Sequence, residues 1–173
     1  MYLMIKRMLL IASLGLAGMA TAQDIGNPVN VAFRLGFGYP IDDVTRAQVG
    51  NMIGFGGDYF FEKSLLGNTE TYLSFDWLGK SASGAKGNMF PLALNLRWYI
   101  GGDYFSANRT YFHLGAGVAI IDIFGTDSLA MVRSGFGVEL GEHIFIESNF
   151  VYSDQGQGGV RATSAGIYLG YRY

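Results

Sequence analysis

The chain has 173 residues, with 12 Lys or Arg against 14 Asp or Glu and no Cys. Half of its residues are apolar. This slightly acidic balance argues against nucleic-acid binding, which needs a basic surface, and the lack of Cys excludes both disulfides and thiolate metal sites. The 26 Gly and 24 Tyr or Phe, combined with few charges, are typical of a chain built from strands.

The first 22 residues have the organisation of a cleavable signal peptide. Lys6 and Arg7 form a basic start, an uncharged apolar run follows, and Ala20-Thr21-Ala22 fits the small-x-small cleavage pattern. An uncleaved anchor is the alternative, but the run is shorter than the roughly 20 residues of a membrane-spanning helix. We therefore predict a signal peptide over residues 1–22 and one domain over residues 23–173.

Eight stretches of that domain alternate between apolar residues and polar or small ones with a period of two, which is the period of a strand. Pro91 falls within the fourth stretch, and because proline cannot donate to a ladder, we expect it near the start of its strand or at a bulge. In chain order the predicted strands cover residues 29–39, 51–61, 70–78, 89–100, 110–121, 129–140, 143–152 and 164–173.

The connections between these strands are short and rich in Gly and polar residues, which predicts hairpins and an antiparallel up-and-down order. An even number of strands lets the first pair with the last, so that no edge stays unpaired. The lengths of the predicted strands are close to the roughly 9–11 residues that a tilted membrane-spanning strand needs. The connections at one end are predicted as loops over residues 41–50, 79–87, 122–127 and 153–162, and those at the other as turns over residues 62–68, 101–103 and 141–142.

The charges indicate which face of the predicted barrel points outward. Every charge within the strand cores falls on the polar phase, and none falls on the apolar phase. An eight-stranded barrel has a lumen that side chains just fill, so the large aromatic residues of the apolar phase do not fit inside. We therefore predict an all-β, eight-stranded antiparallel transmembrane barrel with its apolar face outward.

The inward phase then forms a polar network that fills the lumen, and its arginines and carboxylates pair with one another. Glycines on the same phase leave room for large inward side chains. This interpretation favours a packed core over an open pore. The predicted network consists of Arg34, Asp58, Asp76, Arg97, His113, Arg133, Glu139, Glu147 and Arg172.

On the outward phase, aromatic residues gather near the strand ends, as they do at membrane interfaces. They predict two girdles on either side of an aliphatic band. One girdle consists of Tyr39, Trp77 and Tyr152, and the other of Tyr59, Phe61, Trp98, Phe112, Tyr171 and Tyr173.

The last stretch, Ser164–Tyr173, alternates strictly and ends on an aromatic residue. With seven further alternating stretches and the signal peptide, the chain resembles the small eight-stranded bacterial outer-membrane β-barrels, namely the OmpX type and the transmembrane half of the OmpA type. The resemblance implies an outer-membrane location, contact with membrane lipids and lipopolysaccharide, and insertion by the barrel-assembly machinery with periplasmic chaperones. We expect a monomer with a structural or surface-interaction role; a narrow pore and a lipid A-modifying enzyme are the alternatives.

Nothing in the sequence predicts a catalytic site, a cofactor or a metal. The lipid A deacylases among such barrels carry a His-x-Ser element, which neither His113 nor His143 forms. The lipid-phase hydroxyls Ser134 and Ser148 have no histidine on their phase to act as a base. We interpret His113 as a hydrogen-bonded member of the lumen network and His143 as an exposed turn residue.

Overall fold

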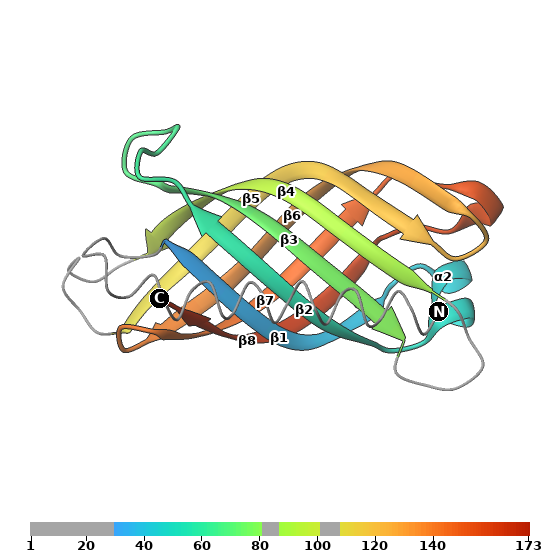
Figure 1. Ribbon diagram of the computed structural model, residues 1–173, viewed down its shortest axis with the longest axis horizontal. Helices are drawn as coiled ribbons and strands as arrows, with labels where there is room; N and C mark the ends of the chain where they lie inside the picture. The colour runs from blue at the N-terminus through green and yellow to red at the C-terminus, as the bar shows by residue number, and fades with distance from the viewer. Residues whose placement is uncertain (1–29, 81–86, 101–107) are drawn as a thin grey trace, which may run out of the picture.

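Eight strands close into one antiparallel barrel, in which each strand pairs with its sequence neighbours and β1 pairs with β8 (Figure 1). The structure, a computed structural model, describes residues 30–80, 87–100 and 108–173. The predicted fold class is therefore confirmed; the predicted signal peptide and the turn at residues 101–103 lie outside the described residues. The strands are β1 (Val31–Pro40), β2 (Met52–Phe60), β3 (Glu70–Lys80), β4 (Asn88–Ile100), β5 (Asn108–Asp122), β6 (Thr126–Leu140), β7 (Ile144–Ser153) and β8 (Ser164–Arg172).

The two ends of the barrel differ. One end, called the helix end here, carries the helix α2 (Asp43–Val49), the β5–β6 connection and the 3-10 turn η1 (Gln157–Gly159). At the opposite end β1 begins, β8 finishes, and the β2–β3 connection extends beyond the barrel wall (Figure 1). No helix among the described residues is long and apolar enough to cross a membrane.

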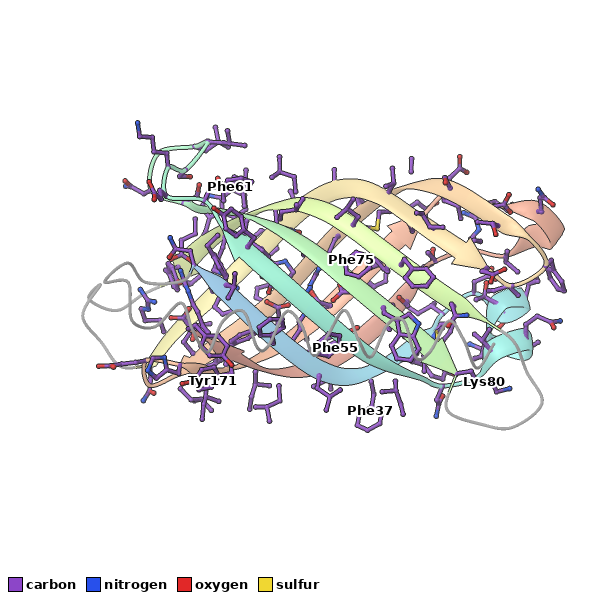
Figure 2. All side chains as sticks on the ribbon, in the orientation of Figure 1. Phe37, Phe55, Phe61, Phe75, Lys80 and Tyr171 are labelled. Carbon is purple, nitrogen blue, oxygen red and sulfur yellow. The ribbon has the colours of Figure 1, made fainter. Side chains whose placement is uncertain are left out.

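Burial alternates along the strands in the phase that the sequence predicts. In β7 each outward residue is exposed and each inward residue is buried, without interruption from Ile144 to Ser153. Leu35 and Phe37 are 61% and 71% exposed, whereas Arg34, which directly precedes Leu35 in β1, is 1% exposed. Figure 2 shows Phe37 projecting away from the barrel wall. The apolar face is therefore the outer face, and the charged face lines the lumen.

The segment 41–50, which we predict as a loop, contains the helix α2 instead. Asp42 caps its start, because one carboxylate oxygen accepts from both the backbone N–H and the hydroxyl of Thr45, each at 2.8 Å. Gly50 ends the helix with a φ of 60°, a conformation that suits glycine, and its N–H donates to the carbonyl of Arg46. The helix places the fully buried Val49 among the lumen residues at this end.

The predicted loop over residues 122–127 is wrong for half of its length. The ladder between β5 and β6 continues through the pairs Ile121↔Asp127 and Asp122↔Thr126, which leaves only residues 123–125 outside the strands. Ile121 and Leu129 are buried at this level, so lumen packing supports strand pairing where the local sequence is turn-like. The wall consequently reaches farther at the helix end than the alternation alone predicts.

Pro91 lies near the start of β4, as expected. The β3–β4 ladder pairs Phe75 with Leu92 and Leu78 with Met89, and it is interrupted between those two pairs, where Pro91 lies. On its other side Pro91 keeps its place in the register opposite Ala119. The missing N–H thus affects only one of the two ladders of β4.

Candidate functional site: the barrel lumen

The middle of the lumen holds a cluster of buried charges from five strands. Arg34 donates to Asp58 at 2.6 and 2.8 Å and to Asp76 at 2.8 and 3.0 Å. Arg133 reaches Asp76 at 3.0 Å and Glu147 at 3.2 Å. Because Asp76 and Glu147 each serve both arginines, the five side chains form one connected unit, which we call the central ion cluster.

The next layer toward the opposite end is built around Arg97. Its guanidinium carbon lies 4.0 Å from the ring centre of Tyr111, 4.9 Å from that of Phe60 and 5.0 Å from that of Tyr72. One terminal nitrogen of Arg97 also lies 3.8 Å from Glu147 of the central ion cluster. Ring faces are attractive to a cation that has lost its water, so aromatic side chains replace part of the hydration of this buried charge.

Charged side chains and one tyrosine, all partly exposed except the buried Glu139, close the opposite end. We call them the rim cluster: Glu70, Tyr99, Arg109, Glu139 and Arg172. Arg172 donates to Glu70 at 3.1 and 3.2 Å, and Arg109 donates to Glu139 at 2.7 Å. The Tyr99 hydroxyl donates to Glu139 at 2.8 Å and lies 3.0 Å from Glu70. Arg97 lies 3.4 Å from Glu139, and this contact links the rim cluster to the layer built around Arg97.

The three layers together balance their charge. Five arginines face five carboxylates, and each carboxylate lies within 4.0 Å of at least one arginine nitrogen. Breaking a buried ion pair typically costs about 3–5 kcal/mol, so a matched set of charges stabilises the packed lumen far better than an unmatched set would.

The structure brings eight of the nine predicted network residues into this arrangement, and His113 differs. His113 is fully buried, but neither ring nitrogen makes a hydrogen bond to a residue that the structure describes. Its Nε2 lies 3.9 Å from Glu147 Oε1, an oxygen that accepts from Arg133 and Asn149. The expectation that His113 is hydrogen-bonded is therefore wrong, because Arg133 and Asn149 already donate to the carboxylate oxygen nearest to it.

Two charged members of the rim cluster were not predicted. Glu70 and Arg109 lie at the first residues of β3 and β5, where the alternation is only beginning. Each nevertheless shares the phase of an inward neighbour, Tyr72 and Tyr111 respectively. Glu70 is the first residue of the predicted strand over residues 70–78, and Arg109 directly precedes the predicted strand over residues 110–121. Following the inward phase to the first residue of one strand and one residue beyond the other would have identified both.

The lumen at the helix end is apolar, contrary to the expectation of a polar network throughout. Val49 of α2 packs there with inward residues of the strands, among them three buried methionines. Methionine adapts its shape to irregular spaces, which suits it to fill the end of a cylinder. We call this cluster the apolar plug; it consists of Val49, Met52, Leu78, Met89, Ala93, Ala119, Ile121, Leu129, Met131, Val151, Val160 and Ala162.

Glycines make room for the largest inward rings, as predicted. A Cβ atom at Gly137 would overlap the ring of Tyr111, and one at Gly170 would overlap the ring of Phe145. These close approaches bring the two aromatic rings directly against the glycine backbone of the wall. The ring of Tyr111 is thereby held beside Arg97.

All nine residues of the predicted girdles lie on the outer face. Six of them are exposed, and Trp77, Trp98 and Phe112 are half-buried by outer-face neighbours. Tyr171 packs edge-on against Tyr173 with ring centres 4.9 Å apart, and Trp98 stacks on Phe112 at 5.7 Å. Their contact with membrane interfaces stays a prediction.

Among the described residues, no group of three or more His, Asp or Glu side chains has the arrangement of a metal site. The carboxylates of the lumen face arginines instead. The arrangement neutralises charge within a closed wall, which is a structural property.

Comparison with known proteins defines the class of fold. No family model matches the sequence, and no curated protein matches it either. Among solved structures, the outer membrane enzyme PagL has a TM-score of 0.53 at 14% identity over 82% of this chain and 96% of that one. The designed barrel TMB2.3 has a TM-score of 0.51 at 13% identity, covering 86% of this chain and 97% of that one. The outer membrane protein Ail of Yersinia pestis has a TM-score of 0.50 at 15% identity, covering 83% and 98%.

These similarities show that the chain has the fold of the small eight-stranded outer-membrane β-barrels. At such low identity they define the fold alone. One of the three neighbours is an enzyme, so the fold by itself does not decide between catalytic and non-catalytic roles.

Proposed function

We propose that the protein is an integral barrel of the bacterial outer membrane with a structural or surface-interaction role and a lumen closed to solutes. Residues of the outer face provide an apolar band suited to acyl chains. The observation that carries the proposal is the filled lumen, with the apolar plug at the helix end and the central ion cluster, the Arg97 layer and the rim cluster filling the rest. In this proposal the helix end faces the outside of the cell.

The filled lumen favours this role over a narrow pore. A permeating ion would have to cross the plug around Val49 and then separate the pairs that Glu147 makes with Arg34 and Arg133. Both steps are costly, because the first removes water from the ion and the second leaves buried charges unmatched.

The connections at the helix end form a linked surface, which supports a role in surface interaction. The Thr45 hydroxyl of α2 accepts from the N–H of Arg161 at 2.8 Å and lies 3.0 Å from the carbonyl oxygen of the same residue. The N–H of Gln157 donates to Asp127 at 2.7 Å. These bonds join α2 and the β5–β6 hairpin to the β7–β8 connection, so that a partner would meet a preorganised surface.

The proposed partners follow from the location. They are outer-membrane lipids and lipopolysaccharide around the wall, and the barrel-assembly machinery and periplasmic chaperones during insertion. The barrel is proposed to work as a monomer, because its closed sheet leaves no strand edge for a second chain.

Two measurements on one set of variants test the proposal. The chain has no Cys, so Val44→Cys on α2 and His143→Cys at the opposite end introduce single exposed thiols. We expect a maleimide on a large polymer to label intact cells at position 44 only, and at position 143 after the outer membrane is opened. The reverse pattern, or no labelling of either thiol, contradicts the proposed location and orientation.

The same purified variants are then reconstituted in planar bilayers. We expect no steady single-channel current, and heat-modifiable migration on gels confirms that the reconstituted protein is folded. Reproducible conductance steps from folded protein would replace the closed barrel by the pore alternative.

A further inference from the structure

We propose that the β2–β3 connection, residues 61–69, is a membrane anchor whose Leu65 and Leu66 side chains insert into the top of the phospholipid leaflet. Leu65 and Leu66 are 65% and 55% exposed, and neither belongs to a strand. In the orientation proposed above, this connection lies on the periplasmic side of the membrane. The inference rests on the proposed location of the barrel and adds a lipid-binding segment outside the strands.

Thr71 shows on which side of the wall the connection lies. Thr71 shares the outward phase of Leu73 in β3, yet it is 1% exposed. Its hydroxyl oxygen accepts from the N–H of Leu65 at 2.9 Å and lies 3.2 Å from the Ser64 hydroxyl. The connection therefore covers a side chain that points outward from the barrel. It lies on the lipid-facing side of the wall and not over the lumen.

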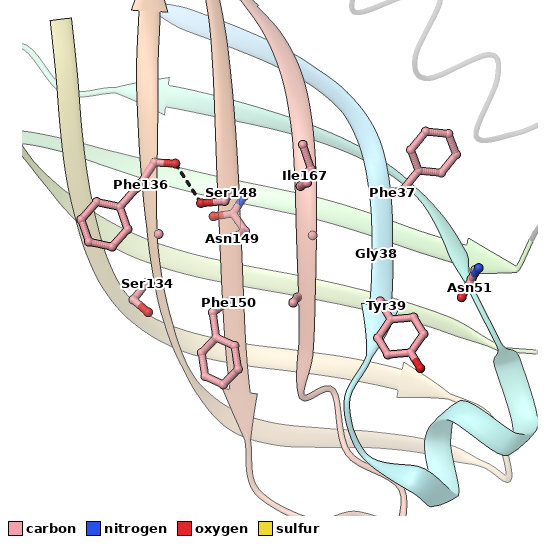
Figure 3. A pocket seen from close by; sticks show the side chains of 13 residues that line it. Phe37, Gly38, Tyr39, Asn51, Ser134, Phe136, Ser148, Asn149, Phe150 and Ile167 are labelled. Carbon is pink, nitrogen blue, oxygen red and sulfur yellow. Dashed lines mark hydrogen bonds between the residues drawn. The ribbon is translucent and has the colours of Figure 1, made fainter.

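Large neighbours on adjacent strands do not by themselves bury a small outward residue. Ser148 lies between Phe136 on β6 and Ile167 on β8, in a groove on the outer face. It nevertheless remains exposed, and its hydroxyl donates to the carbonyl of Phe136 at 3.2 Å (Figure 3). Thr71 also has large apolar neighbours on both adjacent strands, so its burial is due to the connection that packs on it.

The connection also lies at the level where the membrane interface is expected. The ring of Phe61, with which it begins, packs edge-on against Tyr59 with ring centres 5.5 Å apart, and both rings belong to the predicted girdle. The connection stands clear of the wall near the same end of the barrel as the β6–β7 turn (Figure 1), and Phe61 lies at its base (Figure 2). A loop in this place meets lipid headgroups and the tops of acyl chains.

The peptide groups around the two leucines are already hydrogen-bonded, which lowers the cost of leaving water. The N–H of Leu65 donates to Thr71, and that of Leu66 donates to the Ser64 hydroxyl at 3.2 Å. The carbonyl of Leu66 accepts from the N–H and the hydroxyl of Thr69, at 3.1 and 2.6 Å. Because a backbone group without a partner is costly in lipid, these bonds allow the leucines to enter the leaflet.

The charges of the connection suit the same placement. Of residues 61–69, only Glu62 and Lys63 are charged, and both are exposed. A long side chain such as Lys63 can keep its amine among the headgroups while its stem lies along apolar groups. The two opposite charges leave the segment neutral, so it binds a phospholipid surface through its leucines and requires no particular headgroup.

Depth-dependent fluorescence quenching tests the anchor. The chain has no Cys, so Leu66→Cys introduces one thiol for an environment-sensitive fluorophore, and Glu142→Cys in the exposed β6–β7 turn is the matched control. The barrels are reconstituted in phosphatidylcholine vesicles that contain lipids with a nitroxide near the top of one acyl chain. We expect this nitroxide to quench the fluorophore at position 66 and to have little effect at position 142. Equal quenching at both positions, or none at position 66, would overturn the inference.

A second set of variants tests whether the leucines themselves hold the connection in the leaflet. The fluorophore is placed at Asn68→Cys, which keeps both leucines. We expect Leu65→Ser combined with Leu66→Ser to lower the quenching at position 68 by about threefold or more, because the apolar contact is lost. Lys63→Ser, at an exposed polar position of the same connection, should leave it unchanged. Equal quenching with and without the two leucines would also overturn the inference.

Heat-modifiable migration on gels confirms in each case that the barrel is folded. A barrel with the expected thiol labelling on cells and no conductance, but without quenching at position 66, would refute the anchor alone. The reverse pattern of thiol labelling would contradict the proposed orientation, whereas quenching in symmetric phosphatidylcholine vesicles does not depend on it.

Discussion

Glu147 is the side chain on which most of the lumen depends, so its replacement is the sharpest test of the packed core. One carboxylate oxygen accepts from Arg133 at 3.2 Å and lies 3.5 Å from Arg34. The other accepts from the Tyr111 hydroxyl at 2.8 Å and lies 3.8 Å from Arg97. In Glu147→Gln the shape is retained, but three buried arginines lose a shared negative charge.

The size of the effect follows from this geometry. Removing one partner of a buried ion pair costs about 3–5 kcal/mol. Because glutamine fills the same volume and keeps one acceptor, no cavity term is added, and we expect a loss of about 3 kcal/mol. With a denaturant dependence of about 2 kcal/mol per molar urea, the unfolding midpoint falls by about 1.5 M. Unfolding from lipid vesicles can be followed by the fluorescence of Trp77 and Trp98, the two tryptophans of the chain.

Glu142→Gln is the matched control, because Glu142 is exposed in the β6–β7 turn. Its midpoint should change by no more than about 0.3 M, as for an ordinary surface substitution of about 0.5 kcal/mol. Pairing Glu147→Gln with Arg133→Gln should cost less than the sum of the single changes by about 0.5–3 kcal/mol, since both charges then leave together. Equal midpoints for Glu147→Gln and Glu142→Gln would refute the view that paired charges hold the lumen together.

Two further substitutions probe the two ways in which the lumen is filled. Gly137→Ala should destabilise the barrel by about 1–3 kcal/mol, because the new Cβ overlaps the ring of Tyr111. Gly125→Ala is its control: the new Cβ meets only ordinary contacts, so stability in the same urea assay should change by less than about 0.5 kcal/mol. Val49→Ala should lower the free energy of unfolding by about 1–3 kcal/mol because it leaves a cavity in the apolar plug. Val44→Ala, on the exposed side of α2, should lower it by less than about 0.5 kcal/mol. Similar losses of stability for both valines would show that α2 does not seal the barrel.

The lumen combines two solutions to the problem of filling a cylinder. Toward the opposite end it uses charges and rings, with Arg97 between Tyr111 and Tyr72. Toward the helix end it uses methionine and small apolar residues, closed by Val49. A water-filled channel would need neither, so the combination supports a barrel whose wall and ends, rather than its interior, meet other molecules.

The alternation of residues by itself determined the number of strands, their order and the direction each side chain faces. A strand has a period of two, so a charge such as Arg34 beside Leu35 and Phe33 leaves little choice of face. Charged residues at eight inward positions then predicted a neutral lumen. These features are local, because they depend on neighbours one or two positions away in the chain.

Other features became visible only in the tertiary structure, because they depend on distant segments. The pairing of Arg133 with Asp76 joins β6 to β3 across the lumen, and no local pattern specifies that choice of partner. The helix α2 forms where its cap and the buried Val49 both find contacts, and the β5–β6 ladder extends because Ile121 and Leu129 are covered. Sequence alternation sets which way a side chain points, whereas closure of the barrel decides what it meets there.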